Sequence, residues 1–316
     1  MQGNCEKEPL TRELFAEELA GCVAELLGDG YVIMRSSVCK NNGVLKEALV
    51  VRSETRECVP SFYLDEMYRS YKEGCPLVAQ AEHVCEIVRK ECDLGIKDVS
   101  KILTKEWFEE RLFLRLINLE KNQDFLENAV YVRVLDMAAV FFVLTEQDEE
   151  GVKSFSLPKS AWEQAGLGTP EDYYDKILAN TERMFPPQLM RLEETVYQCM
   201  VKNGMDPEEA KEQLEAFRRE CRPSLFYILT NNIRINGAGV LLYSDSLKQA
   251  GDILGEDFYI LPSSVHEVLL LEKKYGEPEE LNAMVELVNR TQVMPEEVLT
   301  DHVYLYEIET GTLAEA

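Results

Sequence analysis

The sequence contains few basic residues for its length. Its 316 residues include 33 Lys and Arg against 58 Asp and Glu, so the formal net charge is −25. A protein that binds nucleic acid by neutralising phosphates needs a clustered excess of Lys and Arg, and an anionic membrane surface attracts the same residues. The composition therefore excludes nucleic-acid binding by direct phosphate neutralisation and argues against a membrane surface as partner.

Long hydrophobic runs are also missing. The longest apolar stretch is residues 137–144, which is well below the roughly 20 residues that cross a bilayer and suits a buried strand. The first ten residues lack the basic start and the apolar run of a secretory signal. We therefore expect a cytoplasmic protein without a membrane segment, and we expect its nine cysteines to be reduced thiols.

Motifs with a fixed chemistry are missing as well. The sequence has no phosphate-binding G-x-x-x-x-G-K-[ST] or G-x-G-x-x-G motif before a helix, no G-x-S-x-G and no H-E-x-x-H. Its three histidines, at 83, 266 and 302, are far apart in the chain. We therefore predict no cofactor and no metal site.

Hydrophobic residues make up 46% of the chain, enough for one or two packed domains. In the N-terminal part, a stripe of apolar residues at helical spacing predicts a helix at 11–27, with Thr11 as its cap. Two β-rich runs around Asn41-Asn42-Gly43 predict a hairpin, because Asn and Gly tolerate positive φ. Further helices are predicted at 60–71, 76–92 and 105–118.

From residue 129 the pattern changes to strands, and this second part predicts strands and helices in alternation. The predicted strands are 129–135, 137–145, 152–157, 225–230, 237–243, 258–261, 268–271 and 303–308. The predicted helices are 158–166, 170–184, 189–201, a solvated and highly charged excursion at 203–222 capped by Asp206, 244–254 and 277–290.

Hairpins dominate this pattern, which predicts the α+β class. We expect an N-terminal domain over 1–128, built of a helix, a hairpin and helices, and a C-terminal domain over 129–316, built of a mixed, hairpin-rich sheet with flanking helices. Two pairs of similar segments in the second domain fit an internal duplication. They are 160–166 with 246–251, and 180–186 with 289–295. Chance similarity between helical sequences is the alternative.

The densest polar cluster is Pro262-Ser263-Ser264-Val265-His266-Glu267, between two predicted strands. Ser263, Ser264, His266 and Glu267 are the residue types of a serine nucleophile, its base and an orienting carboxylate. Neighbouring residues on a strand point to opposite faces, so His266 and Glu267 cannot simply orient each other. A turn whose hydroxyls bond to the backbone is the other interpretation.

Seven further residues are candidates for binding, on the basis of their polar side chains in predicted turns and at element ends. Lys40 and Asn41 lie at the hairpin tip, where the turn chemistry is an alternative explanation. Asn118, Lys121 and Asn122 follow a predicted helix end, where such residues also bond to free carbonyls. The remaining two are Asn231 and Asp301.

Taken in order, several short motifs carry a resemblance along almost the whole chain. They are Lys40-Asn41-Asn42-Gly43-Val44, Pro60-x-x-Tyr63-Leu64-Asp65-x-x-Tyr68, Leu116-Ile117-Asn118-x-Glu120-Lys121-Asn122, Leu135-Asp136-Met137-Ala138, Leu229-Thr230-Asn231, Gly237-Ala238, Tyr259-Ile260-Leu261-Pro262-Ser263-Ser264-x-His266-Glu267-Val268 and Thr291-Gln292-Val293-x-Pro295-Glu296-Glu297-Val298-Leu299. With this succession the chain resembles an uncharacterised bacterial family, domain of unknown function 5688, over residues 11–308. The resemblance implies an intracellular bacterial protein, but no activity, substrate or cofactor.

Three functions fit these observations. The first is a non-enzymatic interaction or regulatory module that presents an acidic surface to a basic protein partner, because the charge is the property furthest from average. The second is a hydrolase in which Ser263, Ser264, His266 and Glu267 line a pocket completed by Asn231 or Asp301. The third is mimicry of nucleic-acid charge.

Overall fold

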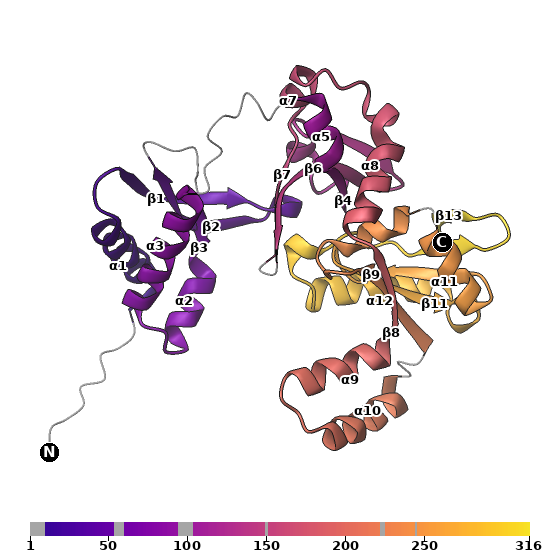
Figure 1. The fold of residues 1–316 in the computed structure, drawn as a ribbon. Helices are drawn as coiled ribbons and strands as arrows, with labels where there is room; N and C mark the ends of the chain where they lie inside the picture. The colour runs from indigo at the N-terminus through magenta and orange to yellow at the C-terminus, as the bar shows by residue number, and fades with distance from the viewer. Residues whose placement is uncertain (1–9, 54–59, 94–103, 149–150, 222–224, 244) are drawn as a thin grey trace, which may run out of the picture. The chain divides into compact units, whose positions relative to one another are not determined.

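The computed structural model describes residues 10–53, 60–93, 104–148, 151–221, 225–243 and 245–316. The chain divides into two compact units (Figure 1). The first comprises residues 1–40 and 44–101, and the second comprises residues 41–43 and 102–316.

The first unit is a three-stranded antiparallel sheet packed against helices. Its strands β1 (Tyr31–Cys39), β2 (Leu45–Ser53) and β3 (Ser61–Tyr63) lie in the order β1-β2-β3, and its helices are α1 (Arg12–Leu27), α2 (Leu64–Lys72) and α3 (Leu77–Asp93). The core joins Phe15 and Leu19 of α1, Leu49 of β2 and Val84 of α3. Thr11 caps α1 as predicted, since its hydroxyl accepts the N–H of Leu14 at 3.3 Å. The helix predicted from residue 60 is wrong in its first turn, because residues 61–63 pair with β2.

The tip of the predicted hairpin is a short 3-10 turn, η1 (Asn41–Gly43). Asn42 has φ 60° and Gly43 has φ 69°. This is the left-handed backbone that the Asn-Gly pair was expected to provide.

The second unit contains two sheets. In the four-stranded sheet, β4 (Leu112–Asn118) and β5 (Tyr131–Val134) pair with opposite edges of β6 (Met137–Asp148), and β7 (Gly151–Ser156) also pairs with β6. The helices around it are α5 (Lys105–Arg111), α6 (Gln123–Leu126), α7 (Lys159–Gln164) and α8 (Pro170–Met184). The six-stranded sheet is antiparallel, in the order β13-β12-β10-β11-β9-β8.

The strands of the larger sheet are β8 (Pro187–Arg191), β9 (Phe226–Asn231), β10 (Phe258–Pro262), β11 (Val268–Glu272), β12 (Tyr304–Glu307) and β13 (Thr312–Glu315). The helices between them are α9 (Leu192–Lys202), α10 (Pro207–Cys221), α11 (Ser246–Leu254) and α12 (Pro278–Thr291), with 3-10 turns η3 (Gly237–Leu242), η4 (Lys273–Tyr275) and η5 (Pro295–Glu297). The antiparallel sheets and their helices confirm the predicted α+β class.

One hydrophobic core joins the two sheets of the second unit. It includes Leu114 and Phe141 of the smaller sheet, Ile260 and Leu270 of the larger sheet, and Val240 of η3. The opposite face of the larger sheet is covered by α12, whose Leu281 and Val285 belong to a second cluster with three residues of that sheet, Tyr259, Leu261 and Leu271. None of the helices in the described ranges has the length and apolar character of a membrane span.

Three predicted elements of this unit are wrong. The helix predicted over 105–118 ends at Arg111, and residues 112–118 form β4. Five of the seven β4 side chains are almost fully buried apolar groups, and an apolar run buried on both faces suits a strand better than an amphipathic helix. The segment 237–243 is the turn η3 rather than a strand, and the helix predicted over 189–201 begins with strand β8.

The boundary expected between residues 128 and 129 lies inside the second unit, because β4 before it pairs with β6 after it. The two halves of the suggested duplication also differ in element order. Helices α7 and α8 follow each other directly, whereas β10 and β11 separate α11 from α12.

Candidate functional site

The loop between β10 and β11 carries the predicted Ser-His-Glu cluster, and it is a tight turn held together by its own groups. The hydroxyl of Ser264 accepts the backbone N–H of His266 at 3.0 Å. The backbone N–H of Ser264 donates to the carbonyl of Glu267 at 3.2 Å. The Ser264 hydroxyl therefore bonds to the backbone, as the turn interpretation expects.

The imidazole of His266 faces two groups other than serine. Its Nδ1 accepts the backbone N–H of Asn236 at 3.1 Å, which places the proton of the neutral ring on Nε2. That nitrogen lies 3.5 Å from a carboxylate oxygen of Glu297. Among the described residues, no serine hydroxyl is hydrogen-bonded to this ring, so the contact that would activate a serine nucleophile is not formed.

Glu267 is half-buried and makes no side-chain hydrogen bond to a described residue. Burial raises the pKa of its carboxyl group, and the nearby positive charge of Arg234 and the imidazole of His266 oppose this rise only in part.

The loop between β9 and η3 is held by the side chain of Asn231. The side chain of Asn231 bonds to both backbone groups of Ile235, at 3.0 Å to the carbonyl and 3.3 Å from the N–H. Arg234 and Asn236 adopt left-handed backbone, with φ 55° and 50°. Asn231 therefore shapes this loop, and its amide is not free for a ligand.

A second polar cluster clamps the irregular segment 295–302. The side-chain amide of Asn42 donates to the carbonyls of Pro295 and Val298 at 2.8 and 2.7 Å. Asn41 and Asn118 donate in the same way, to the carbonyls of Glu296 at 2.7 Å and Leu299 at 2.9 Å. Asn122 bonds to Asn42 through both its side-chain oxygen and its nitrogen, each at 2.8 Å.

The remaining predicted binding residues contact other side chains of the protein. Lys121 lies 3.5 Å from Asp301, and both side chains are partly exposed. Asp301 also accepts the side-chain amide of Asn289 at 2.8 Å. In the first unit, the ammonium group of Lys40 lies 4.0 Å from the centre of the Tyr63 ring.

A carboxylate that the sequence did not single out has three side-chain partners at the turn between β5 and β6. Asp136 accepts hydrogen bonds from the hydroxyls of Thr300 and Tyr304 and lies 3.0 Å from Nδ1 of His302. Burial alone would raise the pKa of Asp136, but these hydrogen bonds outweigh burial and lower it. The one feature of the sequence that pointed to Asp136 was its place in the family motif Leu135-Asp136-Met137-Ala138.

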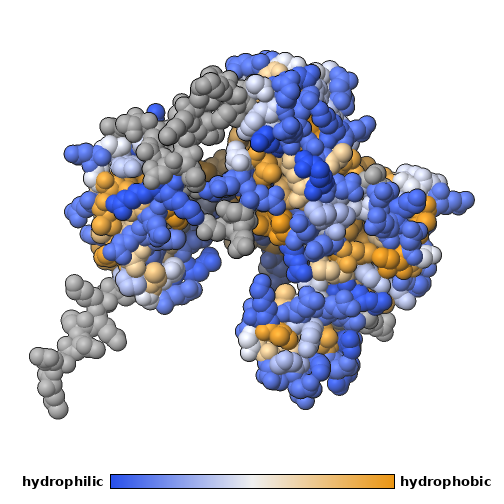
Figure 2. Space-filling view, viewed as in Figure 1, coloured by the Kyte–Doolittle hydropathy of each residue, from blue (hydrophilic) through white to orange (hydrophobic). Residues whose placement is uncertain are grey.

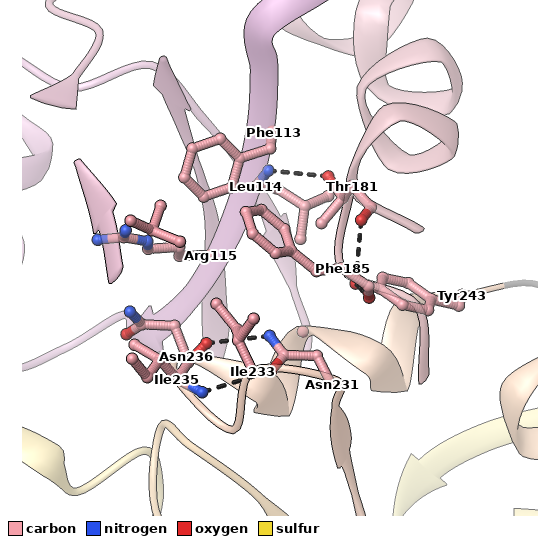
Figure 3. A pocket seen from close by; sticks show the side chains of 12 residues that line it. Phe113, Leu114, Arg115, Thr181, Phe185, Asn231, Ile233, Ile235, Asn236 and Tyr243 are labelled. Atoms are coloured by element: carbon pink, nitrogen blue, oxygen red, sulfur yellow. Dashed lines mark hydrogen bonds between the residues drawn. The ribbon is translucent and has the colours of Figure 1, made fainter. Parts of the chain in front are cut away.

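A cleft lies where β4 meets the loop before η3 (Figure 3). Its enclosed volume is about 10 Å³, room for roughly one water molecule. Its polar side chains include Arg115 and Asn236, and its apolar wall includes Phe113, Phe185 and Ile235. In the described part of the chain, no group of three or more His, Cys, Asp or Glu side chains could hold a metal ion.

Helices α9 and α10 form a helical hairpin, residues 192–221, that connects β8 to the segment before β9 (Figure 1). Asp206 caps α10 as predicted, since its carboxylate accepts the N–H groups of Glu208 and Glu209 at 2.9 and 3.4 Å. Only Ala210 and Leu214 of the described hairpin side chains are buried. Figure 2 shows its visible face as mainly hydrophilic with small hydrophobic areas.

A family model matches residues 12–307, nearly the whole chain. The chain belongs to this family, a family of unknown function (DUF5688). The resemblance predicted from the motifs is therefore confirmed. Searches among curated proteins and among solved structures found no match.

Four of the motifs that suggested DUF5688 meet in space. Side chains from 41–42, from 118–122 and from Asp136 all bond to the segment 295–302. Most of these bonds satisfy backbone carbonyls, which explains the motifs as a framework that holds an irregular segment in place.

Proposed function

We propose that this DUF5688 protein is a non-enzymatic interaction module, and that its helical hairpin binds a basic, amphipathic segment of a partner protein. The observation that carries the proposal is the exposure of α9. This helix has no buried residue, although Val196, Tyr197, Met200 and Val201 place apolar groups along one side of it at helical spacing.

An apolar side that is only half-covered is typical of a surface that binds another helix. Helix α10 packs against α9, and its Ala210 and Leu214 are buried. The apolar side chains of α9, Val196, Tyr197, Met200 and Val201, all keep part of their surface exposed.

The charge of the helical hairpin indicates which kind of partner would fit. Residues 192–221 contain eight Asp and Glu against four Lys and Arg. Two of the basic residues are engaged in ion pairs, Lys211 with Glu208, and Arg218 with Glu193 and Glu215. Acidic groups around an apolar strip favour a partner with Lys or Arg beside its apolar residues, because complementary charges speed association and suppress wrong partners.

The alternative hydrolase hypothesis has less support. His266 would have to give up the Asn236 N–H or its position beside Glu297 before it could act as a base toward Ser263 or Ser264. Nothing in the described loop favours that change over the arrangement present.

The test uses the full chain and a synthetic amphipathic peptide of about 18 residues with Leu on one helical face and Lys on the other. Fluorescence anisotropy measures its affinity at low salt. We expect saturable binding that weakens by about tenfold when Glu194, Glu209 and Glu212 are changed together to Lys, since about 0.5 kcal/mol per charge is a common size for exposed pairs. These three exposed acids pair with no described basic side chain.

The matched control changes Glu17, Glu18 and Glu25 of α1 to Lys, which alters the net charge by the same amount at exposed positions of the first unit. The control should bind the peptide nearly as well as the unmodified protein. Equal loss in both triple variants would assign the binding to overall charge and contradict a role for the helical hairpin.

A further inference from the structure

Helix α12 packs on the larger sheet with one side and carries exposed apolar side chains on another. Its Leu281 and Val285 belong to the cluster on the sheet, whereas Met284, Leu287 and Val288 keep 39, 50 and 38% of their surface exposed. At 3.6 residues per turn, Leu287 lies almost opposite Val285. Leu287 and Val288 follow Met284 by three and four residues, so these three side chains are neighbours on the helix surface.

We call Met284, Leu287 and Val288 the α12 strip. Single exposed apolar residues are common on protein surfaces and need no explanation. Three neighbours on the outer side of one helix form a continuous apolar surface, and such a surface is typical of a contact with another protein.

The charged residues beside the α12 strip are separated along the helix. Glu279 and Glu280 lie in its first turn and Arg290 lies in its last turn. All three are exposed, and none of their side chains forms an ion pair or a side-chain hydrogen bond in the described part of the chain. Arg12 and Arg218, by contrast, each contact two carboxylates of this chain. The unpaired charges of α12 are therefore available to a second molecule.

We propose that the α12 strip binds the α12 strip of a second copy of this chain, with the two helices antiparallel about a two-fold axis. In an antiparallel pair the first turn of each helix lies beside the last turn of the other. Arg290 of each copy then meets Glu279 and Glu280 of the other, and the symmetry forms this contact twice. A parallel pair would instead bring Arg290 against Arg290 and the acids against the acids.

The apolar residues fit the same arrangement. With the two-fold axis near Glu286, Met284 of one copy lies across from Val288 of the other, and the two Leu287 side chains are neighbours at the centre. The apolar surface is thus covered along its whole length by its own equivalent. Because the α12 strip lies outside the helical hairpin, this inference does not depend on the proposed function.

The size of the contact indicates how strong the dimer is. One side of a 14-residue helix buries much less than the roughly 800 Å² per partner of a standard interface, so we expect a weak dimer in rapid exchange. A dissociation constant on the order of 0.1 mM corresponds to such a contact. The net charge of −25 on each copy opposes association, and salt of about 0.15 M screens this repulsion because the Debye length is then about 8 Å.

Sedimentation equilibrium of the full chain, from about 10 μM to about 1 mM in this salt, measures the association. We expect the average molar mass to rise with concentration toward that of a dimer. Leu287→Gln replaces the central apolar side chain at an exposed position and should weaken the dimer by about tenfold or more, since the side chain is buried in both copies. The matched control is Ile253→Gln on α11, where Ile253 is 58% exposed, and it should associate as the unmodified protein does.

Exchange of charges tests the antiparallel arrangement. Arg290→Glu should weaken the dimer by about tenfold, because two sets of exposed charge pairs are replaced by like charges. Adding Glu279→Arg and Glu280→Arg to this variant should restore most of the affinity, because the charges are then exchanged between the two ends of the helix. Circular dichroism checks that each variant keeps its helix content.

A chain that stays monomeric up to about 1 mM would overturn the proposal, as would equal weakening of the dimer by Leu287→Gln and Ile253→Gln. Stronger association of Arg290→Glu than of the unmodified protein would overturn the antiparallel arrangement. A monomeric chain in which Leu287→Gln lowers the affinity for the basic amphipathic peptide would assign the α12 strip to a partner helix and would also overturn the proposal.

Discussion

Gly237 occupies a position where the backbone of η3 touches two other segments. A Cβ atom added there would lie 2.5 Å from the carbonyl oxygen of His266, 2.8 Å from the N of Asn231, and closer still to the hydroxyl of Thr230. Two of these atoms belong to the backbone and cannot move aside cheaply. The glycine is therefore required by packing, and it brings the His266 loop against the end of β9.

We expect Gly237→Ala to lower the free energy of unfolding by about 3 kcal/mol, because overpacking against backbone costs about 1–3 kcal/mol or more. Urea unfolding measures the change. The control is Gly239→Ala in the same turn, where the nearest atom to a new Cβ is a methyl group of Leu114 at 3.6 Å. Similar effects of the two substitutions would show that the close approach at Gly237 does not exist.

Asp136 predicts a specific dependence of stability on pH. Its pKa is lowered in the folded protein from an ordinary value of 3.8, so the folded state binds this proton less readily than the unfolded state. The stabilisation is complete above the unfolded pKa and is lost as the pH falls through the folded pKa. In Asp136→Asn this contribution is absent, and we expect about 1–3 kcal/mol lower stability at neutral pH, since the hydrogen bonds to a charged acceptor are lost.

Urea unfolding of both proteins between about pH 6 and pH 3 measures the effect. The difference between their unfolding free energies should shrink below about pH 4, because all other carboxylates titrate in both. Asp252→Asn, an exposed residue of α11, should give a curve parallel to that of the unmodified protein. A constant difference for Asp136→Asn would contradict the lowered pKa.

At the scale of elements, the helices and turns that are set by caps and turn residues were predicted correctly from the sequence. Helix α8 begins at Pro170 and ends at Met184 as predicted, because Thr169 and Asp172 form a capping box and Pro170 opens the helix. The hairpin around Asn42 and Gly43 was predicted from the φ angles that its turn requires. Caps and turns depend on neighbouring residues, and these are visible in the sequence.

Elements that depend on distant partners were not predicted. The apolar residues of β4 also fit a helix, and only the pairing with β6 decides for a strand. The turn η3 was taken for a strand because its small and branched residues do not reveal that Gly237 meets the carbonyl of His266. For the same reason, the sequence named Asn118 and Asn122 as candidates but could not show that they bond to Leu299 and Asn42.

The helical hairpin should be less stable than the core strand β4. Two of its described side chains are buried, whereas β4 has five buried apolar side chains and pairs along its length with β6. Native-state hydrogen exchange of the free protein should show amides of 192–221 opening with a lower free energy than those of 112–118. Equal protection of the two segments would contradict the open packing on which the partner surface depends.

At the scale of the whole molecule, the net charge of −25 acts over longer distances than any single pair. A net negative charge in general repels polyanions and attracts cations, and salt weakens both effects because the Debye length falls to about 10 Å at 0.1 M. The Ser264–His266 loop and the Asp136 cluster do not depend on this charge. The helical hairpin does, since its proposed partner is selected by charge and held by apolar contact.

The affinity of the basic amphipathic peptide for the full chain, measured at about 50 mM and about 500 mM salt, tests whether the helical hairpin selects its partner by charge and holds it by apolar contact. We expect saturable binding at the lower salt that weakens by tenfold or more at the higher salt, as expected for several exposed charge pairs, with residual affinity from the apolar contacts. Absence of binding at low salt, or an affinity that salt does not change, would contradict it.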